Sequence, residues 1–271
     1  MKEIDMGTDH LKALKGDGLG KIIMNRPEAR NAMSDEMNAA MMATLEDFEN
    51  DPEVRAVILT GSEGAFCAGG DVKGMANKKD DPKRTIDIAI HEQRMHQRGT
   101  SGKLFKMPKP TIAAVNGPAA GAGMSYALSC DLRIMSSEAF MTTAFAKVGF
   151  SGDYGGSYFM TQLIGSAKAR ELYFLSDRIS ADQALELGLT NWVVEPDDLE
   201  LKTKEIAEKL ASGPAVAFRY MKENLNRAMH GDVDDCLDLE ATHHIHCGQT
   251  HDHKNAVKAF VEKKEPVFEG K

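Results

Sequence analysis

Residues 109–134 read KPTIAAVNGPAAGAGMSYALSCDLRI, and the order of patterns along this stretch decides the fold. The run TIAAV at 111–115 is short, apolar and β-branched, which is typical of a strand buried on both faces of a sheet. It leads into a glycine-rich turn and then into residues 121–129, GAGMSYALS, which begin a helix. Glycine at such a turn indicates positive φ or a close approach of the backbone to another group. The stretch therefore predicts a strand, a tight turn and a helix, in that order.

A second stretch repeats this order. Residues 54–60, VRAVILT, form another short apolar run, and the glycine-rich segment GSEGAFCAGGDVKG follows them. Tight packing of a strand against a helix would explain the glycines of a single loop. Two such loops, each after a buried strand, favour a functional role that the loops share. Backbone N–H groups near Ala122, at the positive end of its helix, can converge with an N–H from the CAGGD turn on one oxygen. That arrangement is an oxyanion hole, which needs backbone donors and no particular side chain.

The remaining patterns divide the chain in two. Residues 20–25 and 131–135 resemble strands, while residues 35–49 (with Ser34 as N-cap), 82–104 and 155–175 resemble helices. Ser180 and Gln183 form a capping box for a short helix that ends at Gly188. After residue 196 every pattern is helical, over 197–212, 214–229, 232–247 and 250–263. We therefore predict an α/β core over residues 1–196 and a C-terminal helical region over 197–271.

Composition narrows the class of protein. The chain has 271 residues, 42% of them hydrophobic and 27% charged, which fits one large globular domain with a helical appendage. No apolar run is long enough to span a bilayer, and residues 1–20 lack the apolar centre of a signal peptide, so we predict a cytoplasmic protein with no membrane partner. The four cysteines are far apart and are predicted to be free thiols.

Charge makes a nucleic-acid partner unexpected. The net charge of −8 opposes phosphate binding in general, although a local basic patch would still suit a ligand with a few phosphates. A solvated surface is the competing interpretation of that patch. Its candidate residues are Arg26, Arg30, Lys73, Lys78, Lys79, Lys83 and Arg84.

A histidine-rich run suggests a metal at first sight. Residues 241–253 read ATHHIHCGQTHDH, and His243, His246 and Cys247 could share a helix face. Gly248 is expected to interrupt that face, and the spacing meets no zinc pattern. We therefore predict no metal site.

Asp153 lies in the stretch FAKVGFSGDYGGS at 145–157. Asp beside Gly is common in turns, because its side chain bonds nearby backbone. The aromatic neighbours Phe145, Phe150 and Tyr154 indicate a site poor in water, which would raise the pKa of this carboxyl. On the stretch alone, both a turn role and a chemical role stay open.

Several segments together resemble the crotonase, or enoyl-CoA hydratase/isomerase, superfamily. They are MNRPEARNAM at 24–33, FCAGGDVKGM at 66–75, the stretch at 109–134, LGLTNWVVEP at 187–196 and the tail PVFEG. The resemblance implies a spiral of β-β-α turns, with C-terminal helices that mediate trimers and often hexamers. It also implies an acyl-CoA thioester as substrate, with coenzyme A present only as part of that substrate and no further cofactor.

The resemblance also implies roles for single residues. The thioester carbonyl would lie between the amides of Gly70 and Ala122, and Lys263 and Lys264 would come from a neighbouring subunit. The coenzyme A nucleotide would lie near Arg26, Ala68, Asp71 and Lys73. His91, Met95 and His96 are expected to shape the acyl pocket, Cys67 to pack as a small apolar group, and Asp131 to act as a structural carboxylate or strand cap.

The chain departs from the hydratases of that superfamily at both of their glutamates. Ser125 and Phe145 occupy those positions, and neither is a general base at neutral pH. A carboxylate at the position of Asp153 is an acid or base in some isomerases of the superfamily and a nucleophile in a dehalogenase. We expect an enoyl-CoA isomerase-like proton shuttle through Asp153, with Ser125, Phe145 and Tyr154 lining the substrate site or only packing. The alternatives are nucleophilic or hydrolytic chemistry at Asp153, an atypical hydratase, and a CoA-binding interaction protein.

Overall fold

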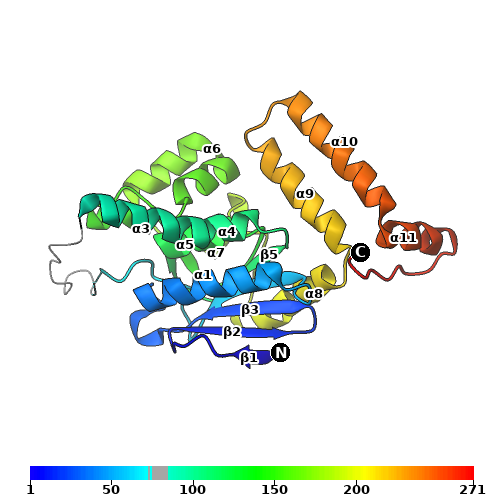
Figure 1. The fold of residues 1–271 in the computed structure, drawn as a ribbon. Helices are drawn as coiled ribbons and strands as arrows, with labels where there is room; N and C mark the ends of the chain where they lie inside the picture. Colours follow the sequence, from blue (N-terminus) through cyan, green and yellow to red (C-terminus); the bar gives the residue numbers. More distant parts are fainter. Residues whose placement is uncertain (73, 75–84) are drawn as a thin grey trace.

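The computed structural model of the chain describes residues 1–72, 74 and 85–271. Its centre is a sheet in the strand order β1-β2-β3-β4-β5-β7-β10 (Figure 1). The first three strands pair antiparallel, and β3, β4, β5, β7 and β10 run parallel. The strands are β1 (Lys2–Ile4), β2 (Leu11–Gly16), β3 (Leu19–Met24), β4 (Ala56–Gly61), β5 (Thr111–Val115), β7 (Leu132–Ser136) and β10 (Trp192–Val194).

A smaller sheet forms beside the large one. It consists of β6 (Ala119–Ala120), β8 (Phe140–Thr142) and β9 (Ile179–Ser180). The chain leaves β5 for β6 and then enters helix α5 (Ala122–Ser129); it leaves β7 for β8 and later enters α6 (Gly156–Leu175). Each turn thus places one strand in each sheet before a helix, which is the β-β-α spiral expected from the sequence.

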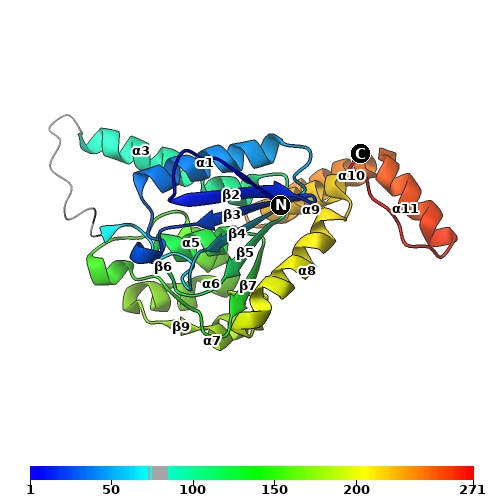
Figure 2. The ribbon, with the colours of Figure 1, turned by 90° about the horizontal axis from the view of Figure 1, so that it is seen from below.

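The parallel strands are buried on both faces. In β4, Val57 and Leu59 belong to one hydrophobic cluster while Ala56 and Ile58 belong to another, as the alternation of side chains along a strand requires. The larger cluster includes residues of α1 (Asp35–Asn50) and α5, and the smaller one includes residues of α8 (Leu199–Ala211). Figure 2 shows α8 along the side of the sheet away from α1. This two-sided burial explains the continuous apolar runs of the sequence.

Most predicted strands are confirmed, with shifts of one or two residues at their ends. Strand β5 has the predicted bounds, and β3, β4 and β7 lie within one or two residues of theirs. No sequence pattern predicted β1 or β2; in β2 the buried Leu11 and Ala13 flank the exposed Lys12, and the alternation then stops. The small sheet was also not predicted, because its strands are at most three residues long.

The helix predictions are confirmed in outline. The hydroxyl of Ser34 accepts from the amide of Met37 and begins α1, and the Ser180 capping box begins α7 (Ala181–Glu186). Of the helix predicted over 82–104, the first residues lie outside the described part, and the rest is α3 (Ile86–Gly99) followed by α4 (Ser101–Lys106). None of the helices that the structure describes is both long and apolar enough to cross a bilayer.

The C-terminal region is helical as predicted. It contains α9 (Ala215–Ala228), α10 (Val233–Gln249) and α11 (His251–Val261), after α8. One detail was wrong: α10 continues through Gly248, because its backbone keeps helical geometry there without a side chain. Helices α9 to α11 extend away from the core in both views (Figures 1 and 2). The division at residue 196 stays a prediction.

A buried lysine attaches α9 to the core. Lys222 Nζ donates to the carbonyl oxygens of Leu104 (2.9 Å) and Lys109 (3.1 Å) and forms an ion pair with Asp131 Oδ2 (2.8 Å). Asp131 also accepts from the backbone and hydroxyl of Thr111, at the start of β5. The structural role expected for Asp131 is therefore present in the contacts, because one carboxylate connects a strand to a C-terminal helix.

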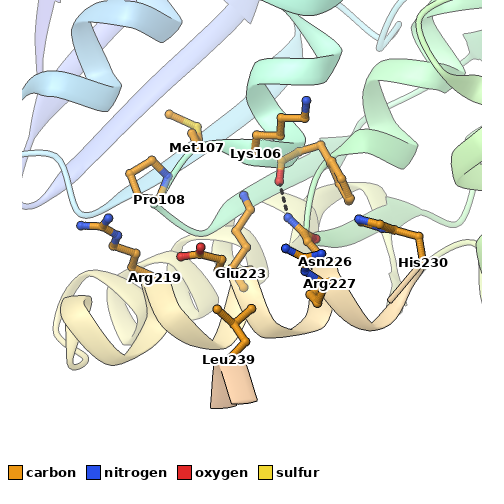
Figure 3. Close-up of a pocket in the computed structure, with 11 residues that line it drawn as sticks. Lys106, Met107, Pro108, Arg219, Glu223, Asn226, Arg227, His230 and Leu239 are labelled. Carbon is orange, nitrogen blue, oxygen red and sulfur yellow. Dashed lines mark hydrogen bonds between the residues drawn. The ribbon is translucent and has the colours of Figure 1, made fainter. Parts of the chain in front are cut away.

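A cavity of about 470 Å³ lies beside this attachment, between α9 and the loop before β5 (Figure 3). Asn226 Nδ2 donates to the Phe105 carbonyl oxygen at 3.0 Å across it, which is the dashed line in Figure 3. The chain end also returns to the core, where Arg55 donates to the carbonyl oxygens of Phe268 (3.1 Å) and Gly213 (2.5 Å). These bonds fix α9 and the tail to the sheet.

The buried ion pair predicts a stability effect. Lys222→Met keeps the length of the side chain but leaves a partly buried carboxylate and two carbonyl oxygens without their donor, so the free energy of unfolding should fall by ~3 kcal/mol. Urea unfolding followed by circular dichroism measures the change. Lys204→Met is the control, because Lys204 forms an exposed pair with Glu208 at 3.7 Å and its loss should change little. Equal stability of the two variants would contradict the role given to Lys222.

Candidate active site

The two glycine-rich loops lie against each other. Ala120 donates its N–H to the Cys67 carbonyl oxygen at 2.9 Å, and Cys67 donates to the Pro118 carbonyl oxygen at 3.1 Å. A Cβ atom on Gly123 would lie 2.2 Å from the Cys67 carbonyl oxygen, which no other residue can accommodate. Glycine at this position is therefore required for the contact between the loops.

Two backbone amides are left available at this contact. Gly69 has φ of +92°, and a Cβ there would lie 3.5 Å from the Ala122 nitrogen, so the amide of Ala122 lies next to the CAGGD turn. Ala122 is the first residue of α5, where an N–H has no acceptor within the helix. Within the described residues, the N–H groups of Gly70 and Ala122 donate to no acceptor in the turns and loops. Both amides can thus donate to an added oxygen.

The loop after β3 brings Arg26 to the same side of the sheet. Asn31, buried and at φ +57°, accepts from the Arg26 amide at 2.8 Å and donates to the carbonyl oxygens of Ser62 and Ala65 at 2.8 Å each. Arg26 in turn donates to Asp71 Oδ2 at 3.1 Å. Asn tolerates the left-handed conformation that this joint needs.

The structure brings three of the four predicted coenzyme A residues together. Arg26 and Asp71 are paired, and Ala68 donates its N–H to the Arg30 carbonyl oxygen at 3.0 Å, in the same corner. Lys73 lies outside the described residues, as do Lys78, Lys79, Lys83 and Arg84.

A cavity of about 400 Å³ opens beside Gly70 and Asp153. Of the three residues expected to shape an acyl pocket, His96 lines it, whereas His91 and Met95 do not and are exposed. The described lining is completed by Met33, Ser34, Asp35, Asn38, Asp71, Gly74, Glu92, Gln93 and Tyr154.

Asp153 carries the most unusual carboxyl of this cavity. Its Oδ1 atom is buried and has no hydrogen-bond partner among the residues that the structure describes. Burial raises the pKa of Asp153 to about 6. The residue lies between Gly152 at φ +107°, which glycine adopts freely, and Tyr154 at φ +50°, which costs energy for a residue with a side chain. A carboxyl of this kind holds or releases a proton near neutral pH.

The residues around Asp153 divide into buried and exposed. Tyr154 is buried, packs edge-to-face on Tyr126, and its pKa is raised by burial. Phe145 is also buried and stacks on Tyr173. The expectation that Phe150 helps to dry the site was wrong, because its side chain is 57% exposed. The raised pKa of Asp153, expected from these neighbours, is confirmed in direction.

Ser125 and Cys67 have structural contacts. Ser125 is fully buried, and its hydroxyl donates to the backbone oxygen of Asp153 at 3.0 Å. Cys67 is buried between the loops, and burial raises the pKa of its thiol to about 12, which leaves it protonated and packed as an apolar group.

The histidine-rich run serves the packing of α9 against α10. His243 is buried, stacks on Tyr220 with ring centroids 4.1 Å apart, and forms a 2.5 Å hydrogen bond with Asn224. No group of three or more potential metal ligands comes together within the described part of the chain. The prediction of a metal-free protein stays a prediction.

Sequence reasoning missed Gln97. Its Oε1 atom accepts from the amide of Tyr154 at 3.0 Å, although the two residues are 57 positions apart. A glutamine in a polar helix carries no signal for such a contact.

Comparison with known proteins identifies the family. Residues 15–271 match the family described as Enoyl-CoA hydratase/isomerase. The chain is 38% identical over 90% of its length to a short-chain-enoyl-CoA hydratase of Clostridium acetobutylicum, of which it covers 91%. It is 35% identical over 94% of its length to a 1,2-epoxyphenylacetyl-CoA isomerase of Escherichia coli, of which it covers 96%. The chain belongs to the enoyl-CoA hydratase/isomerase family of enzymes, as its resemblance to the crotonase superfamily implied.

Solved structures agree on the fold. An enoyl-CoA hydratase of Bacillus anthracis superposes with a TM-score of 0.89 at 31% identity, over 97% of this chain and all of that one. The mixed α/β architecture described above is therefore the crotonase fold.

The buried carboxyl predicts a pH-dependent stability. The native state binds the Asp153 proton more tightly than the unfolded chain does, so stability contributed by this group falls as pH rises from 3.8 to about 6 and stays low above that. Asn cannot ionise, so Asp153→Asn should be more stable than the wild type by ~1–2 kcal/mol at neutral pH, after allowance for partial exposure.

Thermal melts at neutral pH and at about pH 4 measure this difference, which should disappear at the lower value. Asp177→Asn, at an exposed site, is the control and should melt like the wild type at both. An Asp153→Asn protein that is less stable at neutral pH would show that the carboxylate is well solvated.

Proposed function

We propose that this protein is an acyl-CoA isomerase in which Asp153 moves a proton between carbons of an enoyl thioester. The observation that carries the proposal is one buried carboxyl, in a cavity that also contains Gly70, whose Oδ1 has no hydrogen-bond partner among the described residues. Its pKa of about 6 suits a group that must both take and return a proton near neutral pH.

The proposed reaction needs no co-reactant. The thioester oxygen accepts hydrogen bonds from the N–H groups of Gly70 and Ala122. Asp153 takes a proton from C4 or C2, the electron pair of that C–H bond moves into the conjugated system, and the negative charge reaches the thioester oxygen. Asp153 then returns the proton to the other carbon, and the double bond has migrated. The two amides act where the charge develops, which is where preorganised donors are most effective.

The surroundings of Asp153 support isomerisation over hydration. The resemblance to the superfamily implies that its hydratases add water with two glutamates, and at those two positions Ser125 donates to backbone while Phe145 packs on Tyr173. One carboxyl is enough for a proton shuttle, because the same group removes and returns the proton. The relative named 1,2-epoxyphenylacetyl-CoA isomerase adds support for an isomerase.

A hydratase is the second candidate, and one observation favours it. The relative at 38% identity is named a short-chain-enoyl-CoA hydratase. Hydration of crotonyl-CoA distinguishes the candidates: under our proposal it is very slow or absent, and turnover at the rate of isomerisation would favour the hydratase. Nucleophilic chemistry at Asp153 would instead leave an acyl ester on that residue, detectable by mass spectrometry.

The binding of coenzyme A and the assembly complete the proposal. Arg26, Ala68 and Asp71, with Lys73, would contact the nucleotide, and Lys263 and Lys264 would reach it from a neighbouring subunit. Large apolar side chains on the projecting helices support assembly, since a monomer rarely leaves such groups exposed together. They include Met221, Leu225, Leu237, Ile245, Phe260 and Val261.

A trimer or hexamer is the expected assembly. Light scattering at micromolar concentration measures it directly. A monomer would contradict the proposed role of the C-terminal helices, and the double variant Leu225→Glu, Ile245→Glu should shift an assembled protein towards smaller species.

Asp153→Asn tests the chemistry. Asn makes similar local bonds and tolerates similar dihedrals, so the variant should fold and bind acyl-CoA, yet lose at least ~10²-fold in isomerisation. Mass spectrometry of 3-hexenoyl-CoA incubated in D₂O should show deuterium at C2 or C4 with the wild type and none with the variant. Full activity of Asp153→Asn would show that Asp153 has only a structural role in the turn.

Ala122→Pro tests the amide donor. Proline is tolerated at the first residue of a helix, so the fold should survive while the N–H is removed. Loss of one such donor typically costs ~3–4 kcal/mol in the barrier, a rate loss of about 10²–10³-fold. Ala122→Ser, which keeps the N–H, is the matched control. Equal rates for the two variants would exclude this amide from the site.

A further inference from the structure

The peptide group between Asp153 and Tyr154 is held on both of its polar atoms by side chains. Its oxygen accepts from Ser125 Oγ at 3.0 Å and from the Gly156 N–H at 3.1 Å. Its N–H donates to Gln97 Oε1 at 3.0 Å. A backbone N–H can only donate, so the facing atom of the glutamine is its carbonyl oxygen.

This peptide group needs external support. Gly152, Tyr154 and Gly155 all have positive φ, at +107°, +50° and +76°. A non-glycine residue such as Tyr154 pays an energy cost in that region, and the surrounding structure has to hold it there. The hydrogen bonds from Ser125 and to Gln97 stabilise the Asp153–Tyr154 peptide in this conformation, and they thereby limit the directions open to the Asp153 carboxyl.

Gln97 lies on the anchored end of α3. Thr100, just after the helix, is buried, and Gly99 packs closely on Met42 of α1. The same helix lines the candidate cavity through Glu92, Gln93 and His96. Gln97 therefore connects a fixed part of the cavity wall with the backbone beside Asp153.

Ser125 lies on the opposite side of the peptide, within α5. Its hydroxyl is 3.3 Å from the Gly121 carbonyl oxygen and 3.0 Å from the Asp153 oxygen, and it has one proton to donate. A Cβ on Gly156 would lie 2.3 Å from Ser125 Oγ, so the loop closes directly over the hydroxyl. The helix that presents the Ala122 amide thereby also fixes the position of Asp153.

We infer that Gln97 and Ser125 are positioning residues. They hold the Asp153–Tyr154 peptide so that the carboxyl reaches the substrate carbon while the two amides bind the thioester oxygen. The inference rests on the proposed function of Asp153. Ser125 thus acts by binding the backbone of the protein and not the substrate, and Gln97 contributes to the reaction through the N–H of Tyr154. A displacement of about 1 Å at a catalytic group can cost 10²-fold in rate, which is why such bonds matter to turnover more than to binding.

The test compares Gln97→Met with Gln97→Glu. Met has a similar shape but no acceptor, whereas Glu keeps an oxygen that accepts the Tyr154 N–H. Deuterium exchange into 3-hexenoyl-CoA measures turnover, and titration with butyryl-CoA, a saturated thioester, measures binding. We expect Gln97→Met to lose ~10–100-fold in turnover with binding within about 2-fold. Gln97→Glu should lose less than Gln97→Met, and the pH profile of its turnover should move upward because the added carboxylate raises the pKa of Asp153.

Two further variants make the result specific. Gln162→Met, at an exposed site on α6, is the matched control and should exchange at the wild-type rate. Gln97→Ala, with good helix propensity, repeats the loss of the acceptor if the Met variant folds poorly. Ser125→Ala combined with Gln97→Met should lose less than the product of the single losses, because both hold one peptide group.

The outcomes separate the inference from the proposed function. Wild-type turnover by Gln97→Met beside an inactive Asp153→Asn protein would overturn the positioning role alone. Equal losses in the Met and Glu variants would also overturn it, since the acceptor would then be irrelevant. A wild-type protein that exchanges no proton of 3-hexenoyl-CoA would overturn the proposed function, and the inference with it.

Discussion

The contact between Gly123 and the Cys67 carbonyl oxygen determines how closely the two glycine-rich loops approach. At a Cβ distance of 2.2 Å, any larger residue would push the helix start away from the CAGGD turn. The amides of Gly70 and Ala122 come from different loops, so the convergence that we propose for them depends on that approach. The strands behind them supply rigidity, because β4 and β5 are paired in parallel and buried on both faces. A backbone contact in the core thus controls the geometry of the proposed oxyanion hole, which would use backbone donors alone.

The second constraint is energetic. Burial of a carboxyl opposes folding, and the Oδ1 atom of Asp153 finds no hydrogen bond in the part of the chain that the structure describes. Asp153 is kept in place by its neighbours despite this cost. Ser125 binds the backbone oxygen of Asp153 and Gln97 binds the N–H of Tyr154, so both hold the peptide group between these residues without contacting the carboxyl. A cation beside a carboxylate stabilises its charged form and lowers its pKa, which would not suit a group that takes up a proton near neutral pH. The proposed proton transfer and the stability of the fold therefore make opposite demands on Asp153.

Sequence patterns predicted the parts of the molecule that depend on local preference or on buried periodicity. The β-branched run at 111–115, the Ser34 cap and the Ser180 capping box all formed as expected, and the two loops came together. What escaped prediction depends on partners distant in sequence. The lysine-rich sequence of β2 did not predict a strand, and its strand conformation depends on pairing with β1 and β3. The bond from Tyr154 to Gln97 and the burial of Asp153 Oδ1 follow from three-dimensional packing, which no local pattern encodes.

The hydrogen bond between Arg55 and Phe268 also has a consequence for the order of folding events. Arg55 immediately precedes β4, yet one of its acceptors lies 213 residues later, near the end of the chain. Closing so long a loop costs entropy that only the contacts made afterwards repay. During synthesis the central strands emerge and can pair long before the residues that occupy this corner exist. Docking of the tail onto Arg55 is therefore a late event in folding, and the guanidinium group of Arg55 stays solvated until then.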